Sequence, residues 1–132
     1  MSSYRTYSYQ NTLYNNRVQR FINQGYNEAD AKATAATIVA VPGSSEHHMG
    51  LAVDINEVEE KFENTNAFKW LQENAADYGF IMRYPKDKQN ITKIIYEPWH
   101  YRYVGVEHAK NMNQLDMCLE EYIEYIKNGC KK

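Results

Sequence analysis

Residues 45–54 read Ser-Glu-His-His-Met-Gly-Leu-Ala-Val-Asp, and a second short segment at residues 97–100 reads Glu-Pro-Trp-His. Together the two segments offer two imidazoles and one carboxylate to a metal ion, from His47, His100 and Asp54. A catalytic zinc ion usually takes three nitrogen or oxygen ligands from the protein and keeps a fourth position open for water. These side chains therefore predict a zinc site with an open position.

Glu97 is the carboxylate that remains in the second segment, three residues before His100. A fourth protein ligand would close the metal site, so we expect Glu97 to act as a general base for the attacking water. Arg5 is the next candidate, because a hydrolase that cleaves an amide must stabilise an oxyanion, which a fixed guanidinium can do. These residue types together predict a zinc hydrolase.

The other histidines and the cysteines are given no role in this site. We expect His48 to be an exposed neighbour of His47, and His108 to lie on the surface of the last helix. Cys118 and Cys130 match no zinc-finger spacing, so they could pair near the C-terminus or remain free thiols.

The composition is that of one ordinary globular domain. The 132 residues fit a single domain, and 43% hydrophobic and 24% charged residues are typical values for a soluble protein. A net charge of -2, without a basic patch, argues against nucleic acid as a partner. The chain contains no apolar run of about eighteen residues, the length that predicts a transmembrane helix.

Hydrophobic spacing and turn residues predict helices mixed with a few short, antiparallel-looking strands. Helices are expected over residues 10–24, 28–40, 66–78 and from 107 to the end, with a break near residues 114–116. Strands are expected over residues 51–55, 80–84, 91–96 and 101–104, with a loop over 44–49 and a polar connection over 85–90. Residues 97–100 are expected to form a proline corner that aims Glu97 and His100 at one point. The expected fold class is α+β, with a small antiparallel sheet and flanking helices.

The same motifs resemble the metal-dependent D-alanyl-D-alanine carboxypeptidases, including the VanY-like enzymes of vancomycin resistance. Residues 45–54, as Ser-x-His-x-x-Gly-x-Ala-x-Asp, are similar to the first zinc motif of that family, and residues 97–105 are similar to the second. Residues 3–10 resemble the segment that carries the substrate-facing arginine, and residues 79–85 and 119–122 also fit. The resemblance runs from about residue 3 to residue 125, with the motifs in the right order.

The resemblance implies the small α+β domain shared with lysostaphin-type peptidases and the hedgehog signalling domain. It implies one Zn²⁺ per chain, held by His47, Asp54 and His100. Glu97 would deprotonate a zinc-activated water and pass the proton to the leaving amine, while zinc and Arg5 hold the oxyanion. The substrate would be a peptidoglycan stem peptide, cleaved at the amide before its terminal D-alanine.

The resemblance also implies residues that contact the substrate. Ser45 would contact the terminal region of the peptide, and the cleft would be shaped by Gln10, Tyr84 and Trp99. We expect residues 1–132 to be one zinc peptidase catalytic domain that acts as a monomer, with an upstream region preceding it in the whole protein. If that region exports the protein, the domain works in the cell envelope outside the cytoplasm; otherwise it is cytoplasmic.

Other functions fit the same residues. An L,D-carboxypeptidase, a D,D-dipeptidase/carboxypeptidase and a phage-type L-alanyl-D-glutamate endopeptidase would share the metal site and differ in pocket loops. A non-catalytic cell-wall binding module that contains zinc is the alternative of another class. Glu97 argues against that module, because a pure binding domain has no need of a base three residues before a metal ligand.

Overall fold

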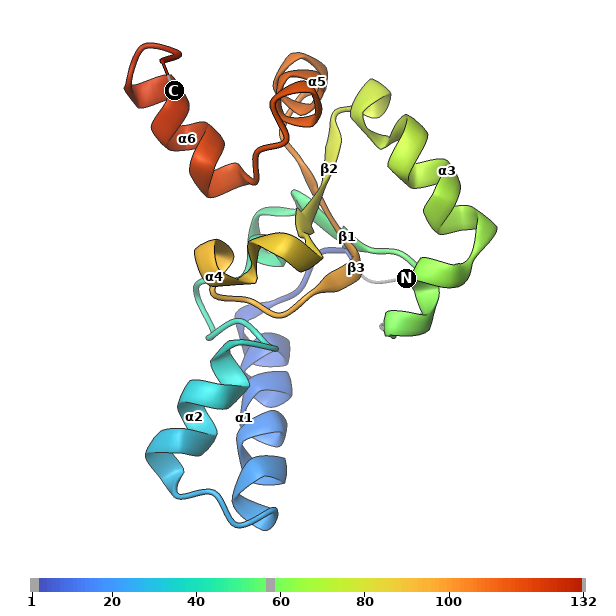
Figure 1. Cartoon of the computed structure of the whole chain (residues 1–132). Coiled ribbons are helices and arrows are strands. Elements are labelled where there is room, and N and C mark those ends of the chain that lie inside the picture. The colour runs from blue at the N-terminus through green and yellow to red at the C-terminus, as the bar shows by residue number, and fades with distance from the viewer. Residues whose placement is uncertain (1–2, 57–58, 132) are drawn as a thin grey trace.

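The computed structural model describes residues 3–56 and 59–131, which form a small sheet with helices around it (Figure 1). The sheet is antiparallel and has the strand order β1-β3-β2. Its strands are β1 (Ala52–Asp54), β2 (Phe80–Tyr84) and β3 (Glu97–Tyr103). The expected α+β class with a small antiparallel sheet is confirmed.

Helices α1 (Tyr7–Asn23) and α2 (Glu28–Ala36) form a hairpin that projects from one end of the molecule (Figure 1). Thr6 caps α1, so this helix begins three residues earlier than expected, and Asn27 caps α2 as predicted. Alanines on α2 allow close packing against α1. The hairpin core contains Val18, Ala31 and Ala35, with Tyr14, Phe21 and Ile22 partly buried against it.

Helix α2 ends at Ala36, four residues before the expected end. The β-branched run Thr37-Ile38-Val39 follows it, and such residues are weak helix formers. The carbonyl of Thr37 instead accepts a hydrogen bond of 3.1 Å from the backbone N–H of Ile95. The predicted loop over residues 44–49 contains a 3₁₀ helix, η1 (Glu46–Met49).

Among residues 85–96, the strand predicted over residues 91–96 was wrong. Residues 85–96 contain the short helices η4 (Lys86–Lys88) and α4 (Gln89–Thr92) and no strand. Lys93 takes a left-handed conformation with φ of 62°, and the Gln89 side chain accepts a hydrogen bond from the N–H of Tyr96. The apolar residues that suggested a strand therefore belong to a segment folded back on itself.

The predicted proline corner at residues 97–100 is also wrong, because these residues belong to strand β3. Between the pairs Tyr84–Glu97 and Met82–Tyr101, β2 advances by two residues and β3 by four, which is a β-bulge. In a regular strand, residues three apart point to opposite faces. The bulge lets Glu97 and His100 share one face, with 3.6 Å between Oε2 and Nδ1.

The remaining helices surround the other end of the sheet (Figure 1). They are η2 (Glu60–Asn64), α3 (Asn66–Asn74), η3 (Ala75–Tyr78), α5 (Val106–Leu115) and α6 (Leu119–Lys127). Their core contains Ala76, Ile81, Ala109, Met112 and Tyr122. The turn at Gly79 needs glycine, because its φ is 82° and an added Cβ would lie 2.6 Å from the Tyr103 ring.

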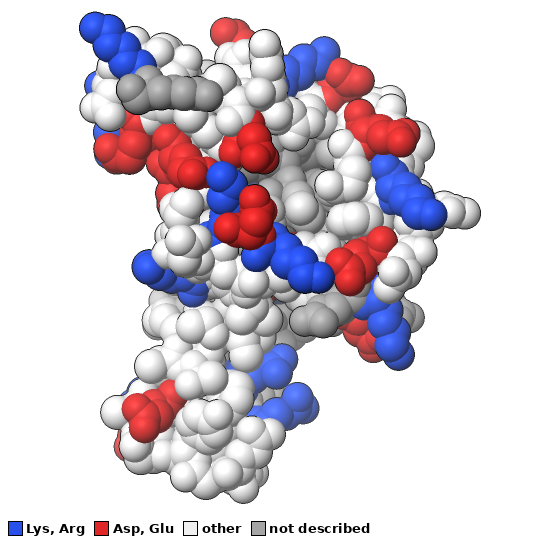
Figure 2. Space-filling view, viewed as in Figure 1, with Lys and Arg blue, Asp and Glu red and all other residues white. Residues whose placement is uncertain are grey.

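His108 is exposed, as predicted, although its Nδ1 lies 3.1 Å from the Tyr122 hydroxyl. Cys118 is buried, Cys130 is exposed, and the two are not bonded to each other. Acidic and basic side chains are interspersed on the face in Figure 2. Within residues 3–56 and 59–131, no helix is long and apolar enough to cross a membrane.

Candidate active site

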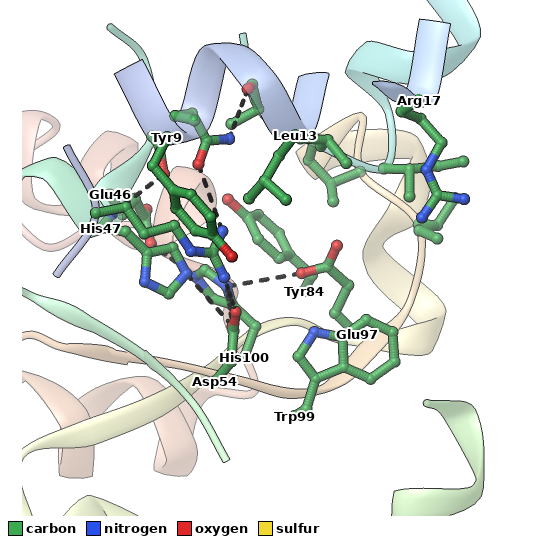
Figure 3. A pocket seen from close by; sticks show the side chains of 18 of the residues that line it. Tyr9, Leu13, Arg17, Glu46, His47, Asp54, Tyr84, Glu97, Trp99 and His100 are labelled. Carbon is green, nitrogen blue, oxygen red and sulfur yellow. Dashed lines mark hydrogen bonds and ion pairs between the residues drawn. The ribbon is translucent and has the colours of Figure 1, made fainter. Parts of the chain in front are cut away.

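Three buried side chains meet where β1, β3 and η1 come together. Asp54 on β1 pairs directly with His100 on β3, and His47 comes from η1 just before β1. Asp54 Oδ1 lies 3.1 Å from His100 Nδ1 and 3.4 Å from His47 Nε2. All three candidate ligand atoms lie within 4.8 Å of one another, and Figure 3 shows the side chains converging at one end of the cavity.

This cluster fits a metal ion. Within the part of the chain that the structure describes, His47 Nε2 and Asp54 Oδ1 are buried and make no hydrogen bond of acceptable geometry, although they lie 3.4 Å apart. Such orphaned polar atoms are rare in folded proteins and cost about 1–3 kcal/mol each. Two ligand atoms bound to a tetrahedral zinc ion at about 2.0–2.1 Å lie about 3.3 Å apart, close to the spacing seen here. Two imidazoles and one carboxylate therefore fit Zn²⁺ with an open position.

Hydrogen bonds orient both imidazoles. His47 Nδ1 donates to the backbone carbonyl oxygen of Ser3. Because a carbonyl oxygen only accepts, Nδ1 carries the ring proton and Nε2 keeps its lone pair for a metal. His100 is held the other way round: its Nε2 lies 3.3 Å from Glu46 Oε2, and its Nδ1 faces Asp54. A carboxylate behind a histidine ligand is a common arrangement in metal sites.

Glu46 is a functional candidate that the sequence analysis missed. Its Oε1 accepts from Arg83 Nε at 2.7 Å and lies 3.0 Å from an Arg102 guanidinium nitrogen. Burial opposes its ionisation, but the hydrogen bond to His100 and the charge of Arg83 outweigh burial and lower the pKa to about 2. Arg83 also forms two hydrogen bonds, of 2.9 and 2.7 Å, with Glu120 on α6. Glu46 is therefore a fixed carboxylate that positions His100.

We expect Glu46→Gln to weaken zinc binding by about 10- to 100-fold, because an amide orients His100 less strongly than a carboxylate does. Competition with a chromophoric chelator measures this affinity. Glu28→Gln is the matched control, since Glu28 is exposed and pairs only with Lys32 among the described residues. Equal zinc affinities for the two variants would show that Glu46 does not position His100.

Glu97 lies beside the cluster and is buried. Burial raises the pKa of its carboxyl to about 7; the charge of Asp54 adds to this effect, and the charges of His100 and Arg5 oppose it. A carboxyl with a pKa near neutrality can both accept and release a proton. This suits the proton-transfer role predicted for Glu97.

Arg5 lies against the cluster and is held there from both sides. Its guanidinium forms an ion pair with Asp54 Oδ2 and a 3.4 Å hydrogen bond with Gln10 Oε1. Its backbone N–H donates to the carbonyl of His47 at 3.2 Å, and its own carbonyl accepts from His48 Nδ1 at 2.8 Å. The arginine predicted to face the substrate is thus rigidly placed.

The expectation for His48 as an exposed neighbour was wrong. The side chain is half-buried, and its Nε2 accepts from the backbone N–H of Gly43 at 3.2 Å. Because its Nδ1 binds the carbonyl of Arg5, the ring joins the Arg5 segment to the turn that precedes η1. Its role is structural support, which an exposed histidine would not provide.

Every predicted site residue lines one cavity of about 600 Å³. Tyr84 is half-buried, and the centre of its ring lies 4.9 Å from that of His100. Burial raises the pKa of the Tyr84 hydroxyl well above its usual value. The amide of Gln10 is hydrogen-bonded at both ends, since its Nε2 donates to the carbonyl of Ala40 at 2.8 Å and its Oε1 accepts from Arg5. The predicted substrate-contacting residues lining the cavity are Ser45, Gln10, Tyr84 and Trp99. The sequence analysis missed the long wall formed by α1, from Tyr9, Leu13, Asn16, Arg17 and Arg20.

A family model described as VanY, D-alanyl-D-alanine carboxypeptidase, matches residues 1–106 of the chain. The chain belongs to the VanY family. Among its relatives, a D-alanyl-D-alanine carboxypeptidase of Enterococcus faecalis is 48% identical over 122 residues, which are 92% of this chain and 46% of the relative. A bifunctional D-Ala-D-Ala dipeptidase and carboxypeptidase of Enterococcus gallinarum is 43% identical over 96 residues, 67% of this chain and 50% of the relative. The chain thus spans about half the length of these two relatives.

Solved structures of two VanY proteins and of one further carboxypeptidase share this fold. VanYB in complex with D-alanine-D-alanine matches with a TM-score of 0.84 and 48% identity, covering 93% of this chain and 68% of that one. A mutant VanY D,D-pentapeptidase in complex with Zn(II) matches with a TM-score of 0.79 and 46% identity, covering 92% and 68%. The L,D-carboxypeptidase LdcB matches with a TM-score of 0.77 and 46% identity, covering 93% and 56%. The family and the fold expected from the motifs are confirmed.

Proposed function

We propose that this chain is a zinc-dependent D-alanyl-D-alanine carboxypeptidase that removes the C-terminal D-alanine from peptidoglycan stem peptides. The observation that carries the proposal is the meeting of a three-residue metal cluster and the buried Glu97 carboxyl in one cavity. The Zn(II) complex of one VanY relative and the D-alanine-D-alanine complex of another support the metal and the substrate.

His47, Asp54 and His100 would hold the zinc ion. When bound, Zn²⁺ supplies a Lewis acid that polarises the scissile carbonyl and increases the acidity of water. Glu97 takes a proton from the water whose oxygen forms the new bond to the carbonyl carbon. It then returns this proton to the amine nitrogen as the C–N bond breaks, so that one carboxylic acid and one free D-alanine leave the site.

Arg5 would stabilise the oxyanion that develops on the carbonyl oxygen. Its contacts with Asp54 and Gln10 fix the plane of the guanidinium before the substrate arrives. Stabilisation of this kind is effective because the donor needs no reorganisation during the reaction. We expect the protein to act as a monomer, since the described residues of one chain supply every predicted site residue.

The second candidate function is that of an L,D-carboxypeptidase, which removes the D-alanine of a tetrapeptide. It is supported by the similarity to LdcB, which nearly equals that to the Zn(II)-bound VanY mutant in identity and TM-score. The two activities differ in the residue that precedes the terminal D-alanine, so the acyl side of the cavity decides between them. The buried Glu97 carboxyl favours either activity over a binding module.

The deciding experiment measures free D-alanine released from a stem pentapeptide that ends in D-Ala-D-Ala, with zinc and with a chelator. We expect release that depends on zinc. Release from the tetrapeptide alone would favour the L,D-carboxypeptidase, and cleavage between L-alanine and D-glutamate would identify an endopeptidase. If the zinc-loaded protein cleaves none of these substrates, it is a binding module and the proposal fails.

A further inference from the structure

The cavity runs along α1, with the metal cluster at one end. Gln10, Leu13, Arg17 and Arg20 all line it, and their spacing of three, four and three residues places them on one helix face. Since a helix rises 1.5 Å per residue, Arg17 lies about 10 Å along the axis from Gln10, which contacts Arg5. Figure 3 shows Arg17 at the far side of the cavity from His47 and Asp54, with Leu13 between them.

The charges at this far end do not balance. Arg17 is half-buried and Arg20 is exposed, and no carboxylate in residues 3–56 and 59–131 forms an ion pair with either. By contrast, Arg5, Arg83 and Arg102 all pair with carboxylates near the site. Besides Asp54 of the metal cluster, Glu46 and Glu97, the described residues that line the cavity include one further carboxylate, that of Glu59. Among the described residues the far end therefore carries an excess of guanidinium, which prefers a planar anion such as a carboxylate.

The direction of the substrate follows from the reaction. A carboxypeptidase has one residue after the scissile bond, so the long arm of the cavity must hold the acyl side. An extended peptide spans about 3.3 Å per residue, so about 10 Å corresponds to about three residues. In a stem pentapeptide cleaved before its last residue, the third residue before the scissile bond is the second of the chain.

We propose that Arg17, with Arg20 one turn further on, forms a subsite for a carboxylate on the acyl part of the substrate, about three residues before the scissile bond. The inference rests on the proposed carboxypeptidase function. In the stem pentapeptide the group at this position is the free α-carboxylate of the γ-linked D-glutamate. Arg17 makes the main contact because it is half-buried in the wall, whereas Arg20 adds charge from the rim.

The test uses two stem pentapeptides that differ only at the second residue, where the D-glutamate α-carboxylate is free in one and a carboxamide in the other. Their binding to the zinc-loaded protein is measured by calorimetry in the Glu97→Gln background, in which we expect turnover to be slow enough for binding to be measured. We expect the carboxylate peptide to bind about tenfold more tightly, because a charged hydrogen bond is lost in the amide. Arg17→Gln should remove this preference, Arg17→Lys should keep part of it, and added salt should weaken it.

Lys32→Gln is the matched control, because it removes one positive charge from an exposed position on α2 that does not line the cavity. This control should keep the full preference. The same ratio in the Arg17→Gln variant as in the parent would overturn the subsite. An equal loss of affinity for both peptides would also overturn it, since Arg17 would then contact a group common to both.

The wild-type kcat/KM for the same two peptides separates this inference from the proposed function. Cleavage of both peptides without a preference would leave the carboxypeptidase standing and remove the subsite. Without cleavage of either peptide the proposed function fails, and the calorimetric ratio still decides whether Arg17 binds the carboxylate. We expect the preference to lie in KM and to disappear from KM in the Arg17→Gln variant.

Discussion

Replacing Glu97 by glutamine is expected to lower kcat for D-alanine release by about 10²- to 10⁴-fold while zinc stays bound. Glutamine has nearly the same size and fills the same buried place, but it cannot accept a proton from water. The three candidate ligands are untouched by the change, and Glu97 lies 3.6 Å from His100 Nδ1 without being part of the three-residue cluster. The loss should therefore appear in the rate and not in the metal content.

Two measurements on one preparation check this expectation. Single-turnover release of D-alanine gives the rate, and competition with a chromophoric chelator gives the zinc affinity. Glu28→Gln is the control, because it makes the same chemical change as Glu97→Gln at an exposed position. A Glu97→Gln protein that loses zinc would mean that Glu97 is a ligand, and one that keeps full activity would mean that another group moves the proton.

The sequence predicted the metal cluster because its members lie in two compact motifs. His47 and Asp54 are seven residues apart, and a strand over residues 51–55 places Asp54 on the same face as Ala52, which is the buried face in the structure. Pairing of β1 with a single further strand, β3, is then enough to place His100 beside Asp54, because these two residues are partners in the register. Here the motifs in the sequence and the strand pairing in the folded chain bring the same three side chains together, so the cluster could be predicted from the sequence.

The sequence failed where long-range contacts decide the local conformation. The bulge that turns Glu97 and His100 to the same face is a property of the pairing between β2 and β3, which no pattern within residues 97–100 records. Glu46 looked like a loop carboxylate because its partners Arg83 and Arg102 lie on two distant strands.

Helix α1 shows the same limit in another form. Hydrophobic spacing predicted this helix, but Val18 packs against α2 while Leu13 faces the cavity. Helical spacing predicts the residues that share a face of the helix. The position of α2 decides whether that face packs against the core or lines the cavity. The basic wall formed by Arg17 and Arg20 could therefore be recognised only in the folded chain.

Replacing His47 by alanine is expected to abolish the stabilisation of the fold by zinc. An ion that binds only the folded chain stabilises it by about 2.7 kcal/mol at a free concentration of 100 times its Kd. For a domain of this size that energy corresponds to a rise in Tm of roughly 10 °C. Without His47, two candidate ligands remain, Asp54 and His100, and the affinity should fall far enough that the same zinc concentration gives almost no shift.

Thermal unfolding with and without zinc measures this effect, and the zinc-induced shift is compared within each protein so that the cost of removing a buried ring cancels. His108→Ala is the matched control, because His108 is an exposed histidine on α5 and should leave the zinc shift intact. The His47→Ala protein should also release no D-alanine. A full zinc shift in that variant would mean that the ion binds elsewhere, and the unpaired Nε2 of His47 would then need another explanation than a metal ligand.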